Sequence, residues 1–423
     1  MKKEVSIFTG LISVDKNLVG TAVVYKKIAD IFVDLGYQVN MIVPGASDLE
    51  EKGVNFYQYA EISNRKLIKS SSLVIFGAYP PVEPLLYAHK LKKIIVSYLW
   101  SIAPIGSLEF KDFKQAAKQA NLHEYITASY NLSLLLSDKI FCRDEGVRKL
   151  VLGSLISLGR VNLSNYKQDK SFQGLLTVAP FGVSNKNPKL TEHQLRQGIN
   201  GINKDDFILL WNGGIWNWND GETLIKAMSL IKNKKIKLVF QGFKHPAKDS
   251  KLSIKAKQSL ALAKKLGLIN KNVFFLADWV PYNKRANFLL DSNIGVVSSP
   301  DIPEANLFFK TRIYDYLWSE LPLLLNDCEA FASLIKDRGL GLVVKTGDAR
   351  DWAKNIQLLA KDKKLTGSII KNIKKYKREI GWEKTLQPVR DFALKPHSSA
   401  DKKNKLSQLS MNSIKANYDL IIK

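Results

Sequence analysis

Short apolar runs alternate with amphipathic segments from the first residues of the chain onward. Residues 5–8 form an apolar run that predicts a buried strand. The segment 21–35 then places apolar side chains at steps of three and four residues, which predicts a helix, and Gly36 suits its C-terminal end. Residues 39–43 form the next apolar run. This strand–loop–helix–strand order predicts the opening of a doubly wound α/β domain.

The same alternation continues through most of the chain. Further strands are predicted at 73–76, 94–96, 139–142, 175–178, 207–211, 237–240, 273–276, 294–297, 322–325 and 342–344. Helical segments separate most of these runs, so the sheets are expected to be mostly parallel.

Two similar halves are expected, because 423 residues are too many for one ordinary core and the polar segment 184–188 interrupts the pattern. The predicted fold class is α/β, with two Rossmann-like doubly wound domains. The predicted boundaries are 1–185 for the N-terminal domain and 186–381 for the C-terminal domain. The segment 382–395 is predicted to be a helix that joins the N-terminal domain. The segment 396–423 is predicted to be a basic polar tail, loose for part of its length.

The charge of the chain bears on its partners. Lys and Arg total 64 against 39 Asp and Glu, which gives a formal net charge of +25. That excess favours nucleic acid, an anionic membrane surface or phosphate-bearing small molecules, and it does not choose among them. The sequence contains no recognisable module that reads DNA or RNA, so no specific nucleic acid is expected as a partner.

Neither a structural metal site nor a disulfide framework is expected. The two cysteines, Cys142 and Cys328, lie far apart in apolar surroundings, and the five histidines are isolated. The start of the chain lacks the pattern of a secretory signal, and no run reaches the ~18 apolar residues of a membrane span. These features predict a cytoplasmic protein without a bound cofactor or metal.

Candidate chemistry lies in the loops after the predicted strands, because doubly wound sheets bind ligands at the carboxyl ends of their strands. Two such domains facing each other would form a cleft between two sets of loops. The first candidate is the turn with Gly20 and Thr21, where a helix N-terminus offers free N–H groups to a phosphate or a sugar. The alternative is an ordinary strand-to-helix turn.

The segment 211–220 is the second candidate. It combines the turn Gly213-Gly214 with three tryptophans. Aromatic faces such as that of Trp216 bind sugars and bases, although the tryptophans could equally pack two domains together. Downstream, His245 follows another predicted strand and is a further candidate for the same cleft, the alternative being an incidental loop histidine.

The third candidate follows the run 294–297 and is the richest in charge. It contains Glu304, Lys310, Arg312 and Asp315. Lys310 and Arg312 flank the predicted start of a helix, a combination that suits a diphosphate. Asp315 lies one turn further along and could accept hydrogen bonds from a ribose diol. The alternatives are a solvated basic surface for the two cations and a helix-start charge for Asp315.

These segments together resemble GT-B glycosyltransferases of the family 4 type, and more specifically a bacterial surface-polysaccharide branch. From Asp315 to Pro322 the chain has the length of the family's donor-binding signature, with Asp where the family usually has Glu. The matching segments are 20–43, 141–160, 180–182, 211–220, 242–246, 278–282 and 310–322. The resemblance extends to about Pro396.

The resemblance implies transfer of a sugar from a nucleotide-diphosphate donor held mainly by the C-terminal domain. Asp315 would hold the ribose, and the backbone near Val280 would hold the base. Lys310 and Arg312 would hold the diphosphate, and Glu304 would lie near the donor sugar. Glu304, Lys310 and Arg312 are thus the candidate catalytic residues.

The family also implies retaining, metal-independent hexosyl or related glycosyl transfer. The acceptor would be a lipid-linked or saccharide molecule in the assembly of cell-surface polysaccharide or glycolipid. The basic excess would then hold the enzyme at the anionic inner face of the membrane.

Several positions depart from the family pattern. Gly214 and Asn219 stand where the family usually has Arg and Lys. Stabilisation of the donor phosphates would therefore depend more heavily on Lys310 and Arg312. Leu307 stands where the family has its first signature Glu. The stretch 97–100 lacks the family's usual His, which leaves the general base unassigned.

Three alternatives remain open at this stage. One is a protein of the same fold with a different reaction, such as a sugar-nucleotide epimerase, although the missing acidic and His cluster argues against it. The departures at Gly214 and Asn219 fit a GT-B-like protein that serves as a non-catalytic assembly or binding subunit. The net charge alone fits a basic nucleic-acid-binding protein.

Overall fold

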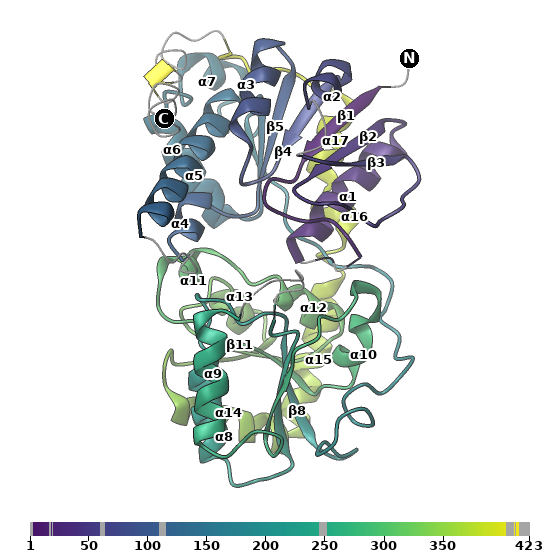
Figure 1. Ribbon diagram of the computed structural model, residues 1–423, viewed down its shortest axis with the longest axis vertical. Helices are drawn as coiled ribbons and strands as arrows, with labels where there is room; N and C mark the ends of the chain where they lie inside the picture. Colours follow the sequence, from purple (N-terminus) through teal and green to yellow (C-terminus); the bar gives the residue numbers. More distant parts are fainter. Residues whose placement is uncertain are drawn as a thin grey trace. The chain divides into compact units, whose positions relative to one another are not determined.

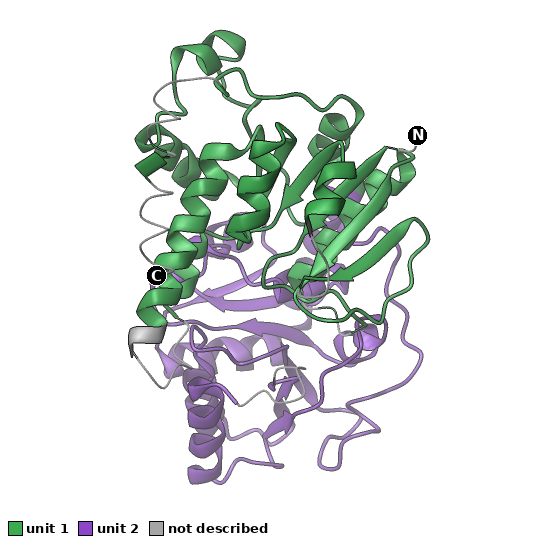
Figure 2. Cartoon of the chain, turned by 45° about the horizontal axis from the view of Figure 1, so that its top comes forward, with its two compact units in different colours: residues 1–181, 383–423 green, residues 182–382 purple. Residues whose placement is uncertain are grey.

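The computed structural model describes residues 3–16, 18, 20–59, 64–109, 116–244, 252–402, 410, 412 and 413. The chain forms two compact units (Figure 2). The first unit comprises residues 1–181 and 383–423, and the second comprises residues 182–382.

Among its described residues, the first unit contains a seven-stranded parallel sheet in the order β3-β2-β1-β4-β5-β6-β7 (Figure 1). Its strands are β1 (Glu4–Phe8), β2 (Gln38–Val43), β3 (Val54–Gln58), β4 (Leu73–Phe76), β5 (Ile94–Leu99), β6 (Lys139–Cys142) and β7 (Leu176–Val178). Its helices are α1 (Gly20–Asp34), α2 (Asn64–Ser70), α3 (Val82–Lys90), α4 (Ala103–Ser107), α5 (Ala116–Leu136), α6 (Glu145–Ser157), α7 (Leu163–Gln168) and α17 (Gln387–Leu394).

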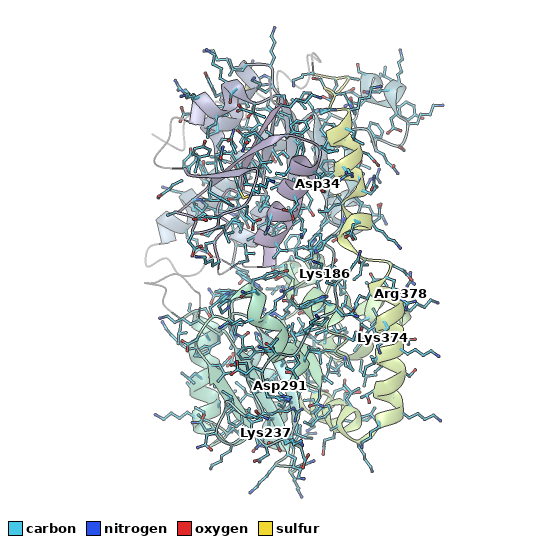
Figure 3. The ribbon with its side chains drawn as sticks, turned by 90° about the vertical axis from the view of Figure 1, so that its right-hand side faces the viewer. Asp34, Lys186, Lys237, Asp291, Lys374 and Arg378 are labelled. Carbon is cyan, nitrogen blue, oxygen red and sulfur yellow. The ribbon has the colours of Figure 1, made fainter. Side chains whose placement is uncertain are left out.

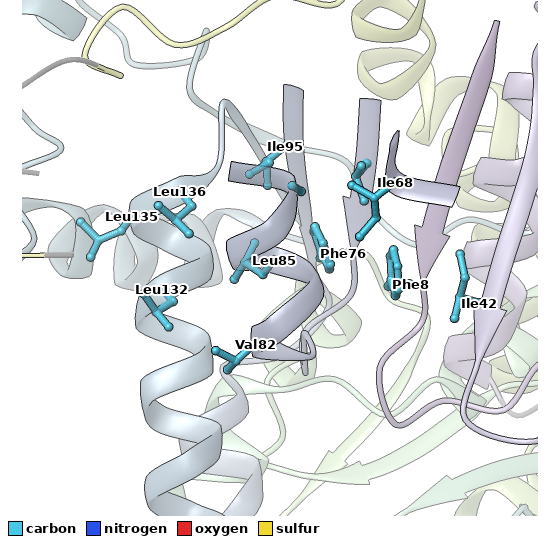
Figure 4. Packing of buried hydrophobic residues seen from close by; sticks show 12 residues of the cluster. Phe8, Ile42, Ile68, Phe76, Val82, Leu85, Ile95, Leu132, Leu135 and Leu136 are labelled. Atoms are coloured by element: carbon cyan, nitrogen blue, oxygen red, sulfur yellow. The ribbon is translucent and has the colours of Figure 1, made fainter. Parts of the chain in front are cut away.

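One hydrophobic cluster of the first unit lies between the sheet and helices α3 and α5. Figure 4 shows side chains of α3 and α5, among them Leu85 and Leu132, facing Phe76 and Phe8 on the strands. Phe8 and Phe76 stack with ring centroids 5.0 Å apart. Burial of such side chains is the main favourable term in folding. It holds β1 and β4 side by side and so fixes the point where their following loops emerge.

The second unit repeats this topology with six parallel strands among its described residues, in the order β10-β9-β8-β11-β12-β13. Its strands are β8 (Phe207–Asn212), β9 (Ile236–Gln241), β10 (Val273–Leu276), β11 (Ile294–Val297), β12 (Leu323–Asn326) and β13 (Gly341–Val344). Its helical segments are α8 (Gly221–Leu230), α9 (Ile254–Lys265), η1 (Tyr282–Lys284), α10 (Arg285–Leu290), α11 (Pro303–Leu307), α12 (Arg312–Trp318), α13 (Ala332–Asp337), α14 (Ala349–Lys361) and α15 (Lys363–Lys377). The helix α16 (Trp382–Thr385) begins at the last residue of this unit.

In each unit the chain order reverses between two central strands, β1 and β4 in the first and β8 and β11 in the second. Doubly wound sheets bind ligands at this switch point, outside the carboxyl ends of the strands. The loops after β8 and β11 are therefore the place to look for a site in the second unit.

Each predicted apolar run overlaps a strand, and the prediction of two Rossmann-like α/β domains is confirmed. Strand β3 was missed, because it lies at the edge of the sheet, is only partly buried and shows no continuous apolar run. The single helix predicted at 382–395 was wrong in detail: it is divided into α16 and α17. Pro388 lies in the first turn of α17, where its missing N–H costs no hydrogen bond.

The polar segment 184–188 is held by the second unit. The carbonyl of Lys186, labelled in Figure 3, accepts a hydrogen bond from Trp318 Nε1 at 2.8 Å. Just before it, Val183 pairs with Gly381 in a parallel bridge. Further on, the buried Asp291, also labelled in Figure 3, accepts the backbone N–H of Leu195 at 2.8 Å. These bonds fix the path of the chain into β8.

The polar C-terminal segment is anchored at its start. Helix α17 packs against α1, and Tyr37 Oη donates to the carbonyl of Ala393 at 3.2 Å. Asp401 and Lys402 then bond to side chains of the first unit, and Asp401 is 1% exposed. As far as residue 402, the segment is therefore bonded into the first unit.

Candidate functional site

The turn after β8 is tightly built. Gly213 has φ +103, in the region that favours glycine. A Cβ on Gly214 would lie 2.3 Å from the Trp216 ring, so only glycine fits beneath this ring. The buried Asn219 accepts the backbone N–H of Trp216 at 2.9 Å, and Asp220 caps α8 by accepting the N–H of Thr223 at 3.0 Å. The turn therefore has one fixed shape.

Arg312 is part of this turn's structure. It is 8% exposed, and its guanidinium lies 4.4 Å from the centre of the Trp211 ring. Its Nη2 donates to the carbonyl of Gly214 at 2.8 Å, and its Nη1 has no hydrogen-bond partner among the described residues. Burial lowers the pKa of Arg312. A buried cation with unused donors is suited to an anionic ligand.

Lys310 is also buried, at 7% exposure, and pairs with Glu304 of α11. The two cations are therefore not a solvated basic surface, and that alternative is wrong. The structure brings Glu304, Lys310 and Arg312 into one region, as the sequence predicted. It adds that the charge of Lys310 is balanced by a carboxylate.

Asp315 lies in the first turn of α12, as predicted, and both of its carboxylate oxygens are engaged. Arg285 Nε donates to Oδ1 at 2.9 Å, and Asn212 Nδ2 donates to Oδ2 at 3.1 Å. The guanidinium of Arg285 lies between the rings of Tyr282 and Trp318, 3.5 and 4.2 Å from their centres. The Asp315 side chain keeps 26% exposure, so each oxygen can still accept a bond from a ligand.

Tyr316 ties α12 to the sheet. Its hydroxyl donates to the carbonyl of Leu210 at 2.8 Å and accepts the N–H of Asn212 at 2.9 Å. Its ring lies directly against Gly295, where a Cβ would be 2.3 Å away. Tyr316 thus holds Asp315 and Arg312 at the ends of β8 and β11.

The sequence analysis missed a further group at the ends of β11 and β12. Ser298, Ser299 and Glu329 are all buried. Both serine hydroxyls and both carboxyl oxygens of Glu329 have no hydrogen-bond partner among the described residues. Burial raises the pKa of Glu329 and outweighs the charges of Lys310 and Arg312, which lower it. Ser298 and Ser299 directly follow a predicted strand and Glu329 lies in the turn after the next one, so the rule that ligands bind at strand ends could have found them.

The remaining residues predicted to bind the donor are Val280, Gly20, Thr21 and His245. Val280 is half-buried and lies between β10 and η1, two residues after Asp278, whose carbonyl accepts from Gln241 Nε2 at 3.4 Å. Gly20 and Thr21 begin α1 in the first unit, as predicted, and are half-buried. His245 lies outside the described residues.

The first unit has an aromatic group at the ends of β4 and β5. Trp100 Nε1 donates to Tyr25 Oη at 3.0 Å and packs against Tyr79. His123 lies on α5, where its Nδ1 bonds Ser107 Oγ at 2.7 Å. No residue here is identified as a general base.

Among the described residues, no three His, Cys, Asp or Glu side chains form a group that could hold a metal ion. None of the helices in this part of the chain combines the length and the hydropathy of a membrane span.

Comparison with known proteins decides the fold. Residues 194–376, nearly all of the second unit, match the model of the family described as glycosyl transferases group 1. WaaG, a glycosyltransferase involved in lipopolysaccharide biosynthesis, is 12% identical with a TM-score of 0.65, over 92% of this chain and 100% of that one. The fold is GT-B.

Two other solved structures have the same GT-B fold. Sucrose-phosphate synthase from Thermosynechococcus elongatus is 14% identical with a TM-score of 0.64, over 93% of this chain and 99% of that chain. Anabaena Alr3699/HepE, in complex with UDP and glucose, is 12% identical with a TM-score of 0.65, over 93% of this chain and 98% of that chain. No curated protein sequence matches this chain. At such identities the likeness establishes the fold alone.

Proposed function

We propose that the protein is a glycosyltransferase that uses a nucleotide-diphosphate sugar as donor, and that the second unit binds this donor. The observation that carries the proposal is the buried cation Arg312, whose Nη1 is unpaired, at the switch point of a glycosyl transferases group 1 domain. Solved GT-B structures that resemble this chain contain UDP, or UDP-glucose, which supports the choice of donor.

The proposed reaction breaks the bond between the anomeric carbon of the sugar and the diphosphate oxygen. It forms a bond from that carbon to an acceptor hydroxyl oxygen. The nucleoside diphosphate departs with the electron pair and takes up the proton of that hydroxyl group. Arg312 and Lys310 stabilise the charge that develops on the leaving diphosphate, since fixed cations in a water-poor site act most strongly on such charge. Asp315 accepts hydrogen bonds from the ribose, and Trp216 and Val280 border the nucleotide.

The proposal includes four finer features. They are retention of the anomeric configuration, independence of a bound metal, transfer of a hexose or related sugar, and an acceptor used in cell-surface polysaccharide or glycolipid assembly. The resemblance to family 4 supports them. Transfer in the presence of EDTA, followed by NMR of the product's anomeric centre, tests the first two.

We also propose a cytoplasmic protein that works at the inner face of the membrane. Large apolar side chains are exposed on and near α6 and α7, with Ile156 at 60% and Leu163 at 74%. Lys149 and Lys167 lie in the same two helices. Apolar side chains beside lysines suit an anionic bilayer surface. Equal flotation of the protein with anionic and with neutral vesicles would contradict the proposed binding to an anionic membrane surface.

The first test is a thermal-shift screen against UDP, GDP, dTDP and their common sugars, with EDTA present. A ligand that binds only the folded protein raises Tm. We expect one nucleotide series to do so, and Arg312→Ala and Lys310→Ala to abolish the shift. Lys377→Ala is the matched control, because Lys377 also pairs with a carboxylate, Glu320 at 2.9 Å, but belongs to α15.

If no nucleotide shifts Tm at millimolar concentration, the donor proposal fails. The binding-subunit and nucleic-acid alternatives would then be tested with saccharide ligands and with salt-dependent DNA and RNA binding.

A further inference from the structure

Glu329 is a buried carboxyl group with unused hydrogen-bonding capacity. It follows β12, is 3% exposed, and both of its carboxyl oxygens have no hydrogen-bond partner among the described residues. Buried polar atoms are nearly always paired, because an unpaired one loses its bonds to water without replacement. A carboxyl group in this state indicates a partner that arrives with a ligand.

The backbone around Glu329 is fixed to the candidate site. The N–H of Ala330 donates to the carbonyl of Ala305 in α11 at 3.0 Å, and the backbone carbonyl of Glu329 accepts the N–H of Ala332 at 2.8 Å. Asn326 receives the N–H of Ser299 at 3.2 Å and donates back to the Ser299 carbonyl at 2.6 Å. The ends of β11 and β12 and helix α11 are therefore locked together, with Glu329 among them.

Charged groups from each neighbouring segment act on Glu329. Lys310 before α12 and Arg312 in α12 lower its pKa, Glu304 in α11 raises it, and burial raises it most strongly. Ser299 also lowers the pKa, although its hydroxyl does not reach hydrogen-bond geometry. The net effect is that burial raises the pKa of Glu329 above the usual value of a Glu carboxyl group.

We propose that Glu329 is a specificity-determining residue of the donor site, whose carboxyl group bonds a hydroxyl group of the transferred sugar. This inference rests on the proposed function. A sugar hydroxyl can donate a hydrogen bond to a carboxyl oxygen of Glu329, and the unpaired hydroxyls of Ser298 and Ser299 can donate to and accept from the same sugar. A diphosphate fits this position less well, because it only accepts and its charge would face both Glu329 and Glu304.

Glu329 would then affect which donor sugars the enzyme accepts. A donor sugar that lacks the bonded hydroxyl, or carries it in the epimeric position, would leave Glu329 buried and unpaired. Sites built around a buried polar partner reject such analogues far more strongly than apolar pockets reject a missing methylene. Glu329 would then make this enzyme discriminate among epimeric sugars on the same nucleotide.

The experiment uses the full chain with the nucleoside diphosphate that raises its Tm, and then its glucose, galactose and mannose derivatives. For Glu329→Leu we expect the Kd of the nucleoside diphosphate to change less than about 3-fold. We expect kcat/KM for the preferred donor to fall roughly 30–100-fold, the loss of one buried hydrogen bond. The preference among the three sugars should shrink at least tenfold. Glu329→Gln, which keeps hydrogen-bonding atoms, should recover a large part of both losses.

Glu222→Gln is the control, since Glu222 on α8 pairs with Lys255 of α9, and the substitution should leave every value unchanged. An equal loss of affinity for the nucleoside diphosphate and for its sugars would place Glu329 on the phosphates and overturn the inference. A folded Glu329→Leu protein with wild-type sugar preference would overturn it as well. Failure of the wild-type protein to bind any nucleotide is a different result, which removes the proposed function itself.

Discussion

Arg160 and Asp401, 241 positions apart, form a buried two-pronged ion pair in the first unit. Arg160 Nε donates to Oδ2 at 2.7 Å and Nη2 donates to Oδ1 at 2.9 Å. The Arg160 side chain is 2% exposed and that of Asp401 is 0% exposed. Arg160 Nη1 also donates to the carbonyl of Leu134 at 2.7 Å, and Asn162 donates to Asp401 at 3.0 Å. The segment after α17 is therefore part of the unit's polar core.

We expect Asp401→Asn to lower the free energy of unfolding by about 3–5 kcal/mol, because it leaves the buried Arg160 charge unbalanced. Burial alone would raise the pKa of Asp401, but the bonds and charge of Arg160 lower it. A carboxyl group whose pKa is lowered in the folded state stabilises the fold at pH values above its unfolded pKa of about 3.9, and this stabilisation is lost as pH falls below that value. Urea unfolding at pH 7 and at about pH 3 measures both effects. Asp391→Asn, on an exposed position of α17, should change stability by less than about 0.5 kcal/mol.

The second prediction is for Tyr316→Phe. Its hydroxyl satisfies the buried N–H of Asn212 at 2.9 Å and the carbonyl of Leu210 at 2.8 Å. Removing the hydroxyl removes both of these hydrogen bonds inside the unit, so we expect a loss of about 1–3 kcal/mol of unfolding free energy in urea titrations. Tyr166→Phe, where the side chain is 45% exposed, should be neutral. Equal effects of the two substitutions would show that the Tyr316 hydroxyl does not hold α12 to the sheet.

The strands of both units were readily predicted because their apolar runs report burial directly. The end of the run 294–297 also placed Glu304, Lys310 and Arg312 in one region, since all three lie in the single segment that follows it, at the edge of the sheet where ligands bind. The edge strand β3 escaped prediction because half-exposed residues carry no continuous apolar signal.

The pairing of charges could not be predicted. Lys310 appeared as a free cation in the sequence, yet Glu304, six residues earlier, neutralises it in the structure. Glu329 escaped notice because its burial depends on contacts between α11 and the turn after β12, which no local pattern records. The partner of Arg160 lies 241 residues away, in a segment whose polar composition suggested a loose tail.

The third prediction concerns the two free cysteines. Burial raises the pKa of Cys142 to about 12 and that of Cys328 to about 11. The thiolate is the reactive form, so at pH 8 roughly one thiol in a thousand or fewer is reactive in the folded protein. We expect negligible labelling by DTNB in native buffer and two equivalents in guanidinium chloride. Rapid labelling of one thiol in native buffer would contradict the buried environment given for that residue.

The last prediction tests the turn after β8 through Gly214→Ala. The new Cβ would lie 2.3 Å from the Trp216 ring, so the ring or the turn must move. Movement of the turn also displaces the Gly214 carbonyl, which accepts from Arg312 Nη2 at 2.8 Å. We expect a loss of about 1–3 kcal/mol of unfolding free energy and of most of the nucleotide-induced rise in Tm. The nucleotide-induced rise in Tm should fall because Arg312 would lose the hydrogen bond to the Gly214 carbonyl that orients it.

Gly367→Ala provides the matched control in the same unit. Gly367 lies inside α15, and a Cβ there meets no atom within 4 Å. Alanine favours a helix interior over glycine, so this variant should gain about 0.5–1 kcal/mol and keep the full nucleotide shift. If Gly214→Ala lost stability but kept the nucleotide shift, the turn would be a folding element alone. Arg312 would then have to be oriented for its ligand by its packing on Trp211.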